Sequence, residues 1–395
     1  MNKITLAKVL IRKKLDGIKF LLARAVTGQG DTVLFESFDG TSYSDNPRFI
    51  SEKLHELYPD TEIVWAFRDP SAKKAVVPDY VRMIKRDESF GFFKELASCR
   101  VWVNNGTFRY VPKRKGQFFI QTWHGDRAFK KVLNDSGHRD KFNKVSEGIE
   151  GYCDLAVCGS SYGEKQYRSA FGYNGKILME GTPRDDCLID PNPDRIRETK
   201  QKLGVADDAK ILLFAPTFRQ NNLLGKTKQE TSGIDISRIL DVLEEKYGGE
   251  WKALLRAHPR LVGLTGNSSD PRITDATGYE DMADLLPASD VLITDFSSSA
   301  GDFALLKRPV LLYQPDKKEY ESNERALYFK MEDSPFFAAE SQQELEDIIR
   351  RVSEADVKEN CEKILEFYGT RETGKSSEKI AGIIHDVIAE RSSGK

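Results

Sequence analysis

The stretch VLITDFSSSAGDFALLKRPVLLY, residues 291–313, determines the fold that we assign to this chain. Residues 291–294 and 310–313 are apolar on both faces, which is typical of strands in a parallel sheet covered by helices. Between them, residues 300–306 predict a helix that begins after three consecutive serines. This strand–helix–strand unit indicates a doubly wound α/β fold.

The same alternation continues along most of the 395 residues and restarts near Asp190-Pro-Asn-Pro-Asp194, where two prolines suggest a hinge. We expect a basic amphipathic helix over residues 1–28, an N-terminal domain over 29–190, a C-terminal domain over 191–370 and a C-terminal helix over 371–395. Both domains are predicted to be Rossmann-like and doubly wound. They should face a cleft that binds ligands at the carboxyl ends of the strands.

Short apolar runs and helical periodicity give the individual elements of this alternation. The predicted strands are residues 32–38, 62–67, 101–104, 118–122, 155–158, 176–180, 211–215, 253–257, 291–294 and 310–313. The predicted helices are residues 47–57, 90–97, 163–170, 236–246, 282–286 and 300–306, followed by a helical tail over 341–391.

Composition excludes several classes of protein. Sixty Lys and Arg against 62 Asp and Glu leave a formal charge of −2, which argues against a nucleic-acid-binding protein. Five scattered cysteines form no CxxC pair, so neither a disulfide framework nor a zinc ribbon is expected. No apolar run reaches the ~18 residues of a transmembrane helix, and no signal-peptide pattern is present. The expected location is cytoplasmic.

The N-terminal segment concentrates positive charge, because its first 26 residues hold seven Lys or Arg and one acid, Asp16. Apolar residues recur there at steps of three and four, forming one stripe of a helix: Ile4, Ala7, Ile11, Leu15, Ile18, Leu22 and Val26. Such a helix can lie on the anionic inner leaflet of a membrane. Alternatively, it packs on its own domain and leaves only a basic face in solvent.

Polar residues follow several predicted strands, where ligands of doubly wound sheets bind. In Gln121-Thr-Trp-His-Gly125, His124 is a candidate general base, or else a hydrogen-bonded histidine that supports the turn. In Leu254-Leu-Arg-Ala-His-Pro259, Arg256 and His258 suit a phosphate-rich ligand, or else form a basic strand end at the surface.

Three further groups belong to the same expected site. Thr294, Asp295, Ser297 and Ser298 precede a helix and can bind an anion, although simple N-capping explains the serines equally well. Arg184 and Arg219 each follow a strand, where they can contact the same anion. The alternatives are that Arg184 forms an interdomain ion pair and that Arg219 shields the following loop. Together these residues predict a polyanion site, for instance for a nucleotide diphosphate. No metal site is predicted, although Asp295 and Asp302 are compatible with Mg²⁺ on a pyrophosphate.

Read in order, these motifs resemble the CDP-glycerol glycerophosphotransferase family of teichoic acid primases and polymerases. The resemblance covers roughly residues 30–370. It includes Phe35-Glu-Ser-Phe, Ser44-Asp-Asn-Pro, Lys113-Arg-Lys-Gly-Gln117, Thr122-Trp-His-Gly125, Gly181-Thr-Pro-Arg-Asp185, Pro216-Thr-Phe-Arg219, Arg256-Ala-His-Pro259, Thr294-Asp-Phe-Ser-Ser298, Asp302-Phe303 and Pro309 to Tyr313 with Asp316.

The resemblance implies a GT-B-like pair of domains and the transfer of a polyol phosphate, with release of CMP. The donor would be CDP-glycerol or CDP-ribitol, and the acceptor a hydroxyl of a lipid-linked glycan or polyol phosphate polymer. It also implies attachment to the membrane surface. In this scheme His124 is the base, His258 contacts the donor phosphate or acts as an acid, and Ser297 and Ser298 hold the donor phosphates.

The chain departs from the family pattern after His124-Gly125, where Asp126-Arg-Ala-Phe-Lys130 replaces the usual Thr-Pro-Leu-Lys. A Pro-Gly-Pro-like turn is also missing near Met331-Glu-Asp-Ser-Pro335. Both segments are expected to border the acceptor or the polyol. The alternatives are a GT-B glycosyltransferase that uses a sugar nucleotide, and a non-catalytic protein that keeps the fold.

Overall fold

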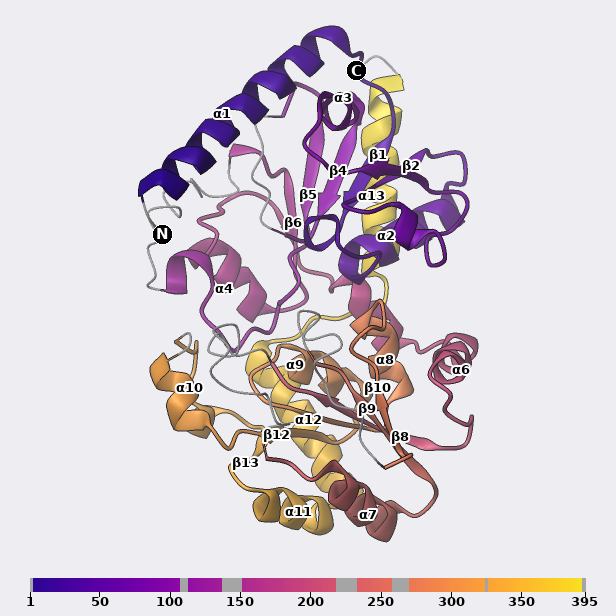
Figure 1. The fold of residues 1–395 in the computed structure, drawn as a ribbon, viewed down its shortest axis with the longest axis vertical. Coiled ribbons are helices and arrows are strands. Elements are labelled where there is room, and N and C mark those ends of the chain that lie inside the picture. Colours follow the sequence, from indigo (N-terminus) through magenta and orange to yellow (C-terminus); the bar gives the residue numbers. More distant parts are fainter. Residues whose placement is uncertain are drawn as a thin grey trace.

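The computed structural model describes residues 3–106, 113–136, 151–217, 233–257, 270–323 and 326–392. Two parallel sheets lie in separate halves of the molecule, one above the other in Figure 1. The first sheet has the order β3-β2-β1-β4-β5-β6-β7. Its strands are β1 (Val33–Glu36), β2 (Ile63–Phe67), β3 (Arg82–Lys85), β4 (Val101–Asn104), β5 (Phe118–Gln121), β6 (Leu155–Val157) and β7 (Ile177–Leu178).

The second sheet has the order β10-β9-β8-β11-β12-β13, and the strand pairs of both sheets are parallel. Its strands are β8 (Lys210–Ala215), β9 (Trp251–Leu255), β10 (Ile273–Asp275), β11 (Val291–Thr294), β12 (Val310–Tyr313) and β13 (Phe337–Ala339). In each sheet the chain first adds strands on one side of a central strand and then on the other. The order therefore reverses between β1 and β4 and between β8 and β11, the positions at which doubly wound folds bind ligands.

Helices cover both sheets. Those of the N-terminal half are α1 (Lys3–Val26), α2 (Asp45–Leu57), α3 (Phe90–Ser98) and α4 (Ser161–Ser169). The others are α5 (Asp186–Ile189), α6 (Pro193–Lys202), α7 (Ile236–Tyr247), α8 (Met282–Ala288), α9 (Ser299–Phe303), α10 (Lys317–Asn323), α11 (Gln342–Arg351), α12 (Glu354–Tyr368) and α13 (Ser376–Ser392).

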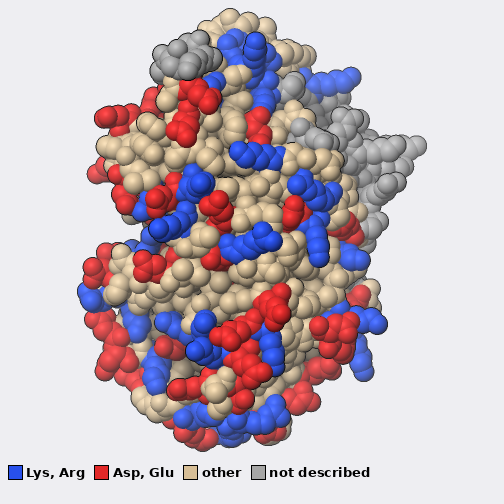
Figure 2. Space-filling model, turned by 180° about the vertical axis from the view of Figure 1, so that it is seen from behind, with Lys and Arg blue, Asp and Glu red and all other residues tan. Residues whose placement is uncertain are grey.

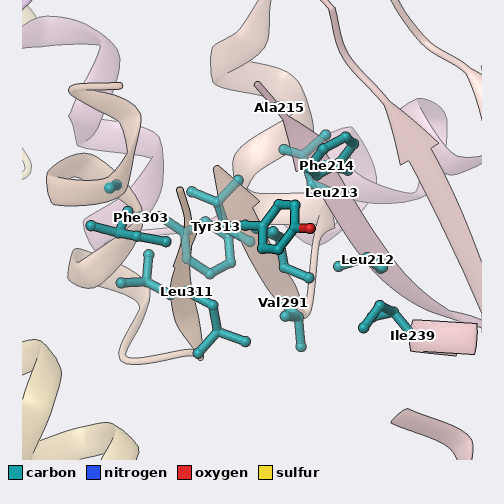
Figure 3. Packing of buried hydrophobic residues seen from close by; sticks show 14 of the residues in the cluster. Leu212, Leu213, Phe214, Ala215, Ile239, Val291, Phe303, Leu311 and Tyr313 are labelled. Carbon is teal, nitrogen blue, oxygen red and sulfur yellow. The ribbon is translucent and has the colours of Figure 1, made fainter. Parts of the chain in front are cut away.

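Each sheet lies within an apolar core. In the second half, Leu213 of β8, Val291 of β11, Leu311 of β12 and Phe303 of α9 belong to one buried cluster (Figure 3). The first sheet separates two clusters, one on each face. The second of these includes residues of α13, which returns to the N-terminal half and packs on α2 (Figure 1). The expected α/β fold with two doubly wound sheets is therefore confirmed.

Three of the four edge strands differ from the expectation. The edge strands β3, β10 and β13 and the helices α6 and α10 were not predicted. Edge strands bury fewer side chains than central ones: β3 is half-buried to exposed throughout, whereas all four residues of β4 are buried. Without two covered faces, such a segment lacks the continuous apolar run that identifies a strand in a parallel sheet.

The described part of the apolar stripe predicted on the N-terminal helix, from Leu15 onward, faces outward. Phe20 and Ala23 anchor α1 in the core and are fully buried, and the helix packs against α3. Leu15, Ile18 and Leu22 of the predicted stripe are instead more than half exposed. Among the side chains that the structure describes, the helix therefore contacts its domain through Phe20 and Ala23, outside the stripe, and Leu15, Ile18 and Leu22 are left uncovered. No described helix is long and apolar enough to span a membrane.

Candidate active site

His124 lies directly after β5, in a loop that buried amide side chains hold in an unusual conformation. The preceding residue, Trp123, has a positive φ of 52°, which non-glycine residues rarely adopt. Its backbone N–H donates to Gln121 Oε1 at 2.8 Å, and its carbonyl accepts from Asn46 Nδ2 at 3.0 Å. Gln121 and Asn46 are fully buried. These hydrogen bonds fix the direction of the His124 side chain, as expected where backbone strain serves a site.

The His124 ring is held as a neutral base. Its Nδ1 lies 2.7 Å from the carbonyl oxygen of Asn105, at the carboxyl end of β4. Because a carbonyl only accepts, Nδ1 carries the proton and Nε2 is left with a lone pair. Phe38, beyond β1, packs on the ring with 5.1 Å between centroids. Burial lowers the pKa of His124 below its ordinary value, so the imidazole is neutral and able to accept a proton at neutral pH.

Thr294 and Asp295 hold together the two central strands of the second sheet. Thr294 Oγ1 donates to the Ala215 carbonyl at 2.6 Å. Asp295 Oδ1 accepts from the backbone N–H groups of Thr217 at 2.9 Å and Phe296 at 2.6 Å. Both Thr294 and Asp295 are buried. Their side chains thus join the ends of β8 and β11 at the reversal of strand order, directly before Ser297 and Ser298 of the predicted phosphate site.

Ser297 and Ser298 are partly exposed at the same reversal point. Ser297 Oγ lies 2.8 Å from Ser299 Oγ, whereas Ser298 precedes α9 without a side-chain cap bond to the helix. A β-carbon built on Gly125 would lie 3.8 Å from Ser298 Oγ, so the His124 loop is in contact with the start of α9. The structure therefore brings the loop that carries His124 in the first half into contact with the start of α9 in the second.

Arg184 makes the interdomain ion pairs that were the alternative to a phosphate contact. Its Nη1 lies 3.3 Å from Asp45 Oδ2 in the N-terminal half, and its Nη2 lies 2.9 Å from Asp302 Oδ2 on α9. Its backbone N–H donates to Asn46 Oδ1 at 3.0 Å. The arginine is buried, and its guanidinium is occupied by carboxylates. This environment favours a positioning role for Arg184.

Arg256 follows β9 and points its Nη1 at the backbone carbonyls of Ala276 and Thr277. Burial lowers the pKa of Arg256, but guanidinium pKa values are so high that the group stays charged. It therefore remains a cation at the carboxyl edge of the second sheet. The other two predicted residues, His258 and Arg219, lie outside the described residues, so their roles stay predictions.

The expectation that the segment Asp126–Lys130 borders the acceptor or the polyol stays a prediction, but its first two residues, Asp126 and Arg127, make their contacts inside the protein. Both side chains are buried, and Arg127 is fully so. Arg127 contacts carboxylates from distant parts of the chain: Asp185, Asp302 and Glu372. Sequence reasoning missed this cluster, because an arginine is buried only when such partners converge on it. The one available signal was the departure from the family pattern directly after His124.

The described part of the chain contains no group of three His, Cys, Asp or Glu side chains arranged to hold a metal ion. On the face shown in Figure 2, basic and acidic side chains alternate over both halves and form no large field of one sign.

Several known proteins are similar to this chain in sequence, and the chain covers a different share of each. The teichoic acid poly(glycerol phosphate) polymerase of Staphylococcus epidermidis is 30% identical over 383 residues, which cover 91% of this chain and 51% of the polymerase. The teichoic acid glycerol-phosphate transferase of Staphylococcus aureus is 30% identical, with 89% and 92% covered. The chain therefore spans about half the length of the first relative and nearly all of the second.

A solved structure of the wall teichoic acid polymerase TagF superimposes with a TM-score of 0.84 at 26% identity and full coverage of both chains. This likeness confirms the GT-B-like arrangement of two domains. The family model of CDP-glycerol:poly(glycerophosphate) glycerophosphotransferase matches residues 18–386. The chain therefore belongs to the CDP-glycerol:poly(glycerophosphate) glycerophosphotransferase family.

Proposed function

We infer that this chain transfers glycerol phosphate from CDP-glycerol to a hydroxyl of a lipid-linked polymer and releases CMP. The observation that carries the proposal is the contact between the His124 loop and Ser298. It supports the proposal because it joins the loop that carries the neutral His124 to the start of the helix that carries the predicted phosphate site. Family membership supplies the class of donor.

In the proposed reaction, His124 Nε2 accepts the proton of the acceptor hydroxyl while its Nδ1 stays bonded to Asn105. The acceptor oxygen forms a bond to the β-phosphorus of CDP-glycerol, and the bond from this phosphorus to the bridging oxygen breaks. CMP leaves with the electron pair of that bond. The hydroxyl groups of Ser297 and Ser298 and the cation of Arg256 would stabilise the phosphate oxygens, as in phosphoryl transfer generally.

His258 and Arg219 are proposed as further contacts to the donor phosphates, on the strength of their family motifs alone. Arg184, Thr294 and Asp295 are proposed to act through others, because the structure bonds their side chains to protein groups. The catalytic group that touches the acceptor is therefore His124, and the groups that touch the donor are proposed to be Ser297, Ser298 and Arg256.

A lipid-linked acceptor requires the enzyme to work at a membrane surface, and α1 offers a suitable contact. Leu15, Ile18 and Leu22 are exposed on this helix, and Lys14 is exposed beside them. Apolar side chains flanked by basic ones bind anionic lipid, with each Lys or Arg near the surface contributing about 1 kcal/mol. We therefore place the protein peripherally on the anionic cytoplasmic leaflet.

A donor panel tests the proposed reaction. The purified protein is incubated with a lipid-linked glycerol phosphate acceptor and, separately, with CDP-glycerol, CDP-ribitol and several UDP-sugars, and the nucleotide released is measured. The proposal predicts CMP from CDP-glycerol and a product heavier by one glycerol phosphate. Faster CMP release from CDP-ribitol would show that the polyol is ribitol and not glycerol. UDP release from a UDP-sugar would show that the protein is a glycosyltransferase.

A further inference from the structure

Arg127 lies at the centre of a buried ionic cluster between the two halves of the molecule. Its Nη1 lies 2.8 Å from Asp185 Oδ2 and 2.7 Å from Asp302 Oδ1, and its Nη2 lies 2.6 Å from Glu372 Oε1. Asp302 is on α9, Asp185 follows β7, and Glu372 follows α12. Three segments far apart in the sequence therefore meet on one side chain of the His124 loop.

Arg184 closes this cluster into a ring. Its Nη2 lies 2.9 Å from Asp302 Oδ2, and its Nε lies 3.6 Å from Asp185 Oδ1. Asp302 and Asp185 thus each face both arginines, one oxygen to each. Two guanidinium groups bridged in this way by two carboxylates permit little relative movement of the segments that carry them.

The backbone around the cluster leaves room for these side chains. A β-carbon at Gly301 would lie 2.7 Å from Arg127 Cδ, and one at Gly159 would overlap the Glu372 carboxylate. A buried ion-pair network of this kind contributes little net stability, because removing charges from water costs about as much as their attraction returns. Its better-attested use is to specify one arrangement of the parts it connects.

The parts connected here are the two sides of the proposed active site. Arg127 is three residues after His124, and Asp302 is four residues after Ser298, about one helical turn along α9. The ion pair between Arg127 and Asp302 and the contact of Gly125 with Ser298 therefore connect the same loop to the same helix. The cluster therefore connects the loop that carries the base to the helix that follows the predicted phosphate site.

We propose that Arg127 is a positioning residue, which sets the distance between His124 and the phosphate site through its ion pair with Asp302. The role rests on the proposed function, because it assigns Arg127 to the alignment of that reaction. Arg127 does not touch the substrate in this scheme. Its loss would leave donor binding intact and misalign the acceptor hydroxyl, and a displacement of 1 Å costs roughly a hundredfold in rate.

The variants Arg127→Lys and Asp302→Asn test this role. Lysine keeps the charge but lacks the planar guanidinium fork with which Arg127 reaches three carboxylates at once, and asparagine keeps the shape of Asp302 but removes its negative charge. Arg48→Lys is the matched control, because Arg48 joins α2 to Asp281 at 3.0 Å and to Asp284 of α8 at 2.7 Å, also across the two halves. For each variant, kcat per folded molecule, KM for CDP-glycerol and the melting temperature are measured.

We expect kcat to fall about ten- to a hundredfold in Arg127→Lys and in Asp302→Asn, with KM changed less than about threefold. Arg48→Lys should have a lower melting temperature than the wild type, while its kcat stays within about threefold. A loss of global stability alone leaves the site of the folded molecules intact. Unchanged kcat in folded Asp302→Asn, or an equal loss in Arg48→Lys, would overturn the positioning role.

Hydrogen exchange separates this inference from the proposed function, since it requires no turnover. In Asp302→Asn, the amides of residues 122–128 and 297–303 should exchange faster together, whereas in Arg48→Lys they should not. If the wild type releases no CMP from CDP-glycerol but this coupled change is seen, the proposed donor is wrong and the mechanical link holds. If exchange in the two segments is unaffected, the link itself is wrong.

Discussion

The Nδ1 atom of His124 lies 2.7 Å from the carbonyl oxygen of Asn105, which fixes the tautomer of a histidine between the two halves of the molecule. The bond comes from the carboxyl end of β4, one of the two strands at which the order of the first sheet reverses. A feature of topology therefore determines which ring nitrogen is available for chemistry.

The pH dependence of turnover should reflect a depressed histidine pKa. Burial lowers the pKa of His124 from the ordinary value of 6.5, and the neutral form is the active base. Activity should therefore persist on acidification through pH 6.5 and be lost only as the pH falls through the lower value. The measurement is kcat/KM against pH with CDP-glycerol. A loss of activity centred at or above pH 6.5 would show that burial does not control this group.

Asn46 should be required for both stability and rate, because it holds the loop from which His124 projects. Its side chain donates to the Trp123 carbonyl and accepts from the Arg184 N–H. In Asn46→Ala these buried groups lose their partners, which should lower the free energy of unfolding by about 1–3 kcal/mol. Denaturant titration and kcat measure the two effects. A variant with normal kcat would contradict the assigned role of the loop conformation.

A methyl group at Gly301 should disturb the ionic cluster directly. The added β-carbon of Gly301→Ala would lie 2.7 Å from Arg127 Cδ and 2.9 Å from its Cβ, so the arginine must shift. Overpacking of this kind costs about 1–3 kcal/mol of stability. Gly278→Ala is the control, because nothing lies within 4 Å of its added β-carbon. Thermal unfolding should show a lower midpoint for the first variant alone, and equal midpoints would contradict the packing described around Arg127.

The exposed stripe of α1 should bind anionic membranes. Leu15, Ile18 and Leu22 are 52%, 54% and 56% exposed, so replacing all three by serine should leave the melting temperature nearly unchanged. Full burial of such side chains contributes about 1.5–3 kcal/mol each, so binding should weaken more than tenfold. Cosedimentation with phosphatidylcholine vesicles, with and without phosphatidylglycerol, measures this effect.

Val76→Ser is the control for the vesicle experiment, because Val76 is 44% exposed and lies outside α1. Its binding should equal that of the wild type. If the triple variant of α1 also sediments as the wild type does, the stripe is not the membrane contact, and the peripheral location must depend on another surface.

The sequence was sufficient for the central strands and the edge strand β7, and insufficient for the edge strands β3, β10 and β13. The bounds of β4 and β11 agree with the prediction because all their residues are buried on two covered faces. Strand β3 was missed because its residues are half-buried or exposed, so that the pattern is no longer apolar. The apolar pattern of a strand depends on how many of its faces are covered by helices. It therefore does not identify a strand that has only one covered face.

The same reasoning separates the parts of the site. The positions of His124 and Ser298 in the fold were predictable, because each follows a buried strand at the carboxyl edge of its own sheet. Arg127 was not predictable, because its burial depends on Asp302 and Glu372, which are 175 and 245 residues away in the chain. No local pattern records partners that only the complete fold brings together.

Single-turnover transfer by His124→Ala tests the central claim most directly. CMP release from CDP-glycerol in the presence of acceptor is compared among the wild type, His124→Ala and His385→Ala, in which the lost histidine stacks on Tyr58 instead. Loss of general-base catalysis should slow transfer by His124→Ala at least a hundredfold while CDP-glycerol binding persists, and His385→Ala should match the wild type. Transfer by His124→Ala at the wild-type rate would contradict the account.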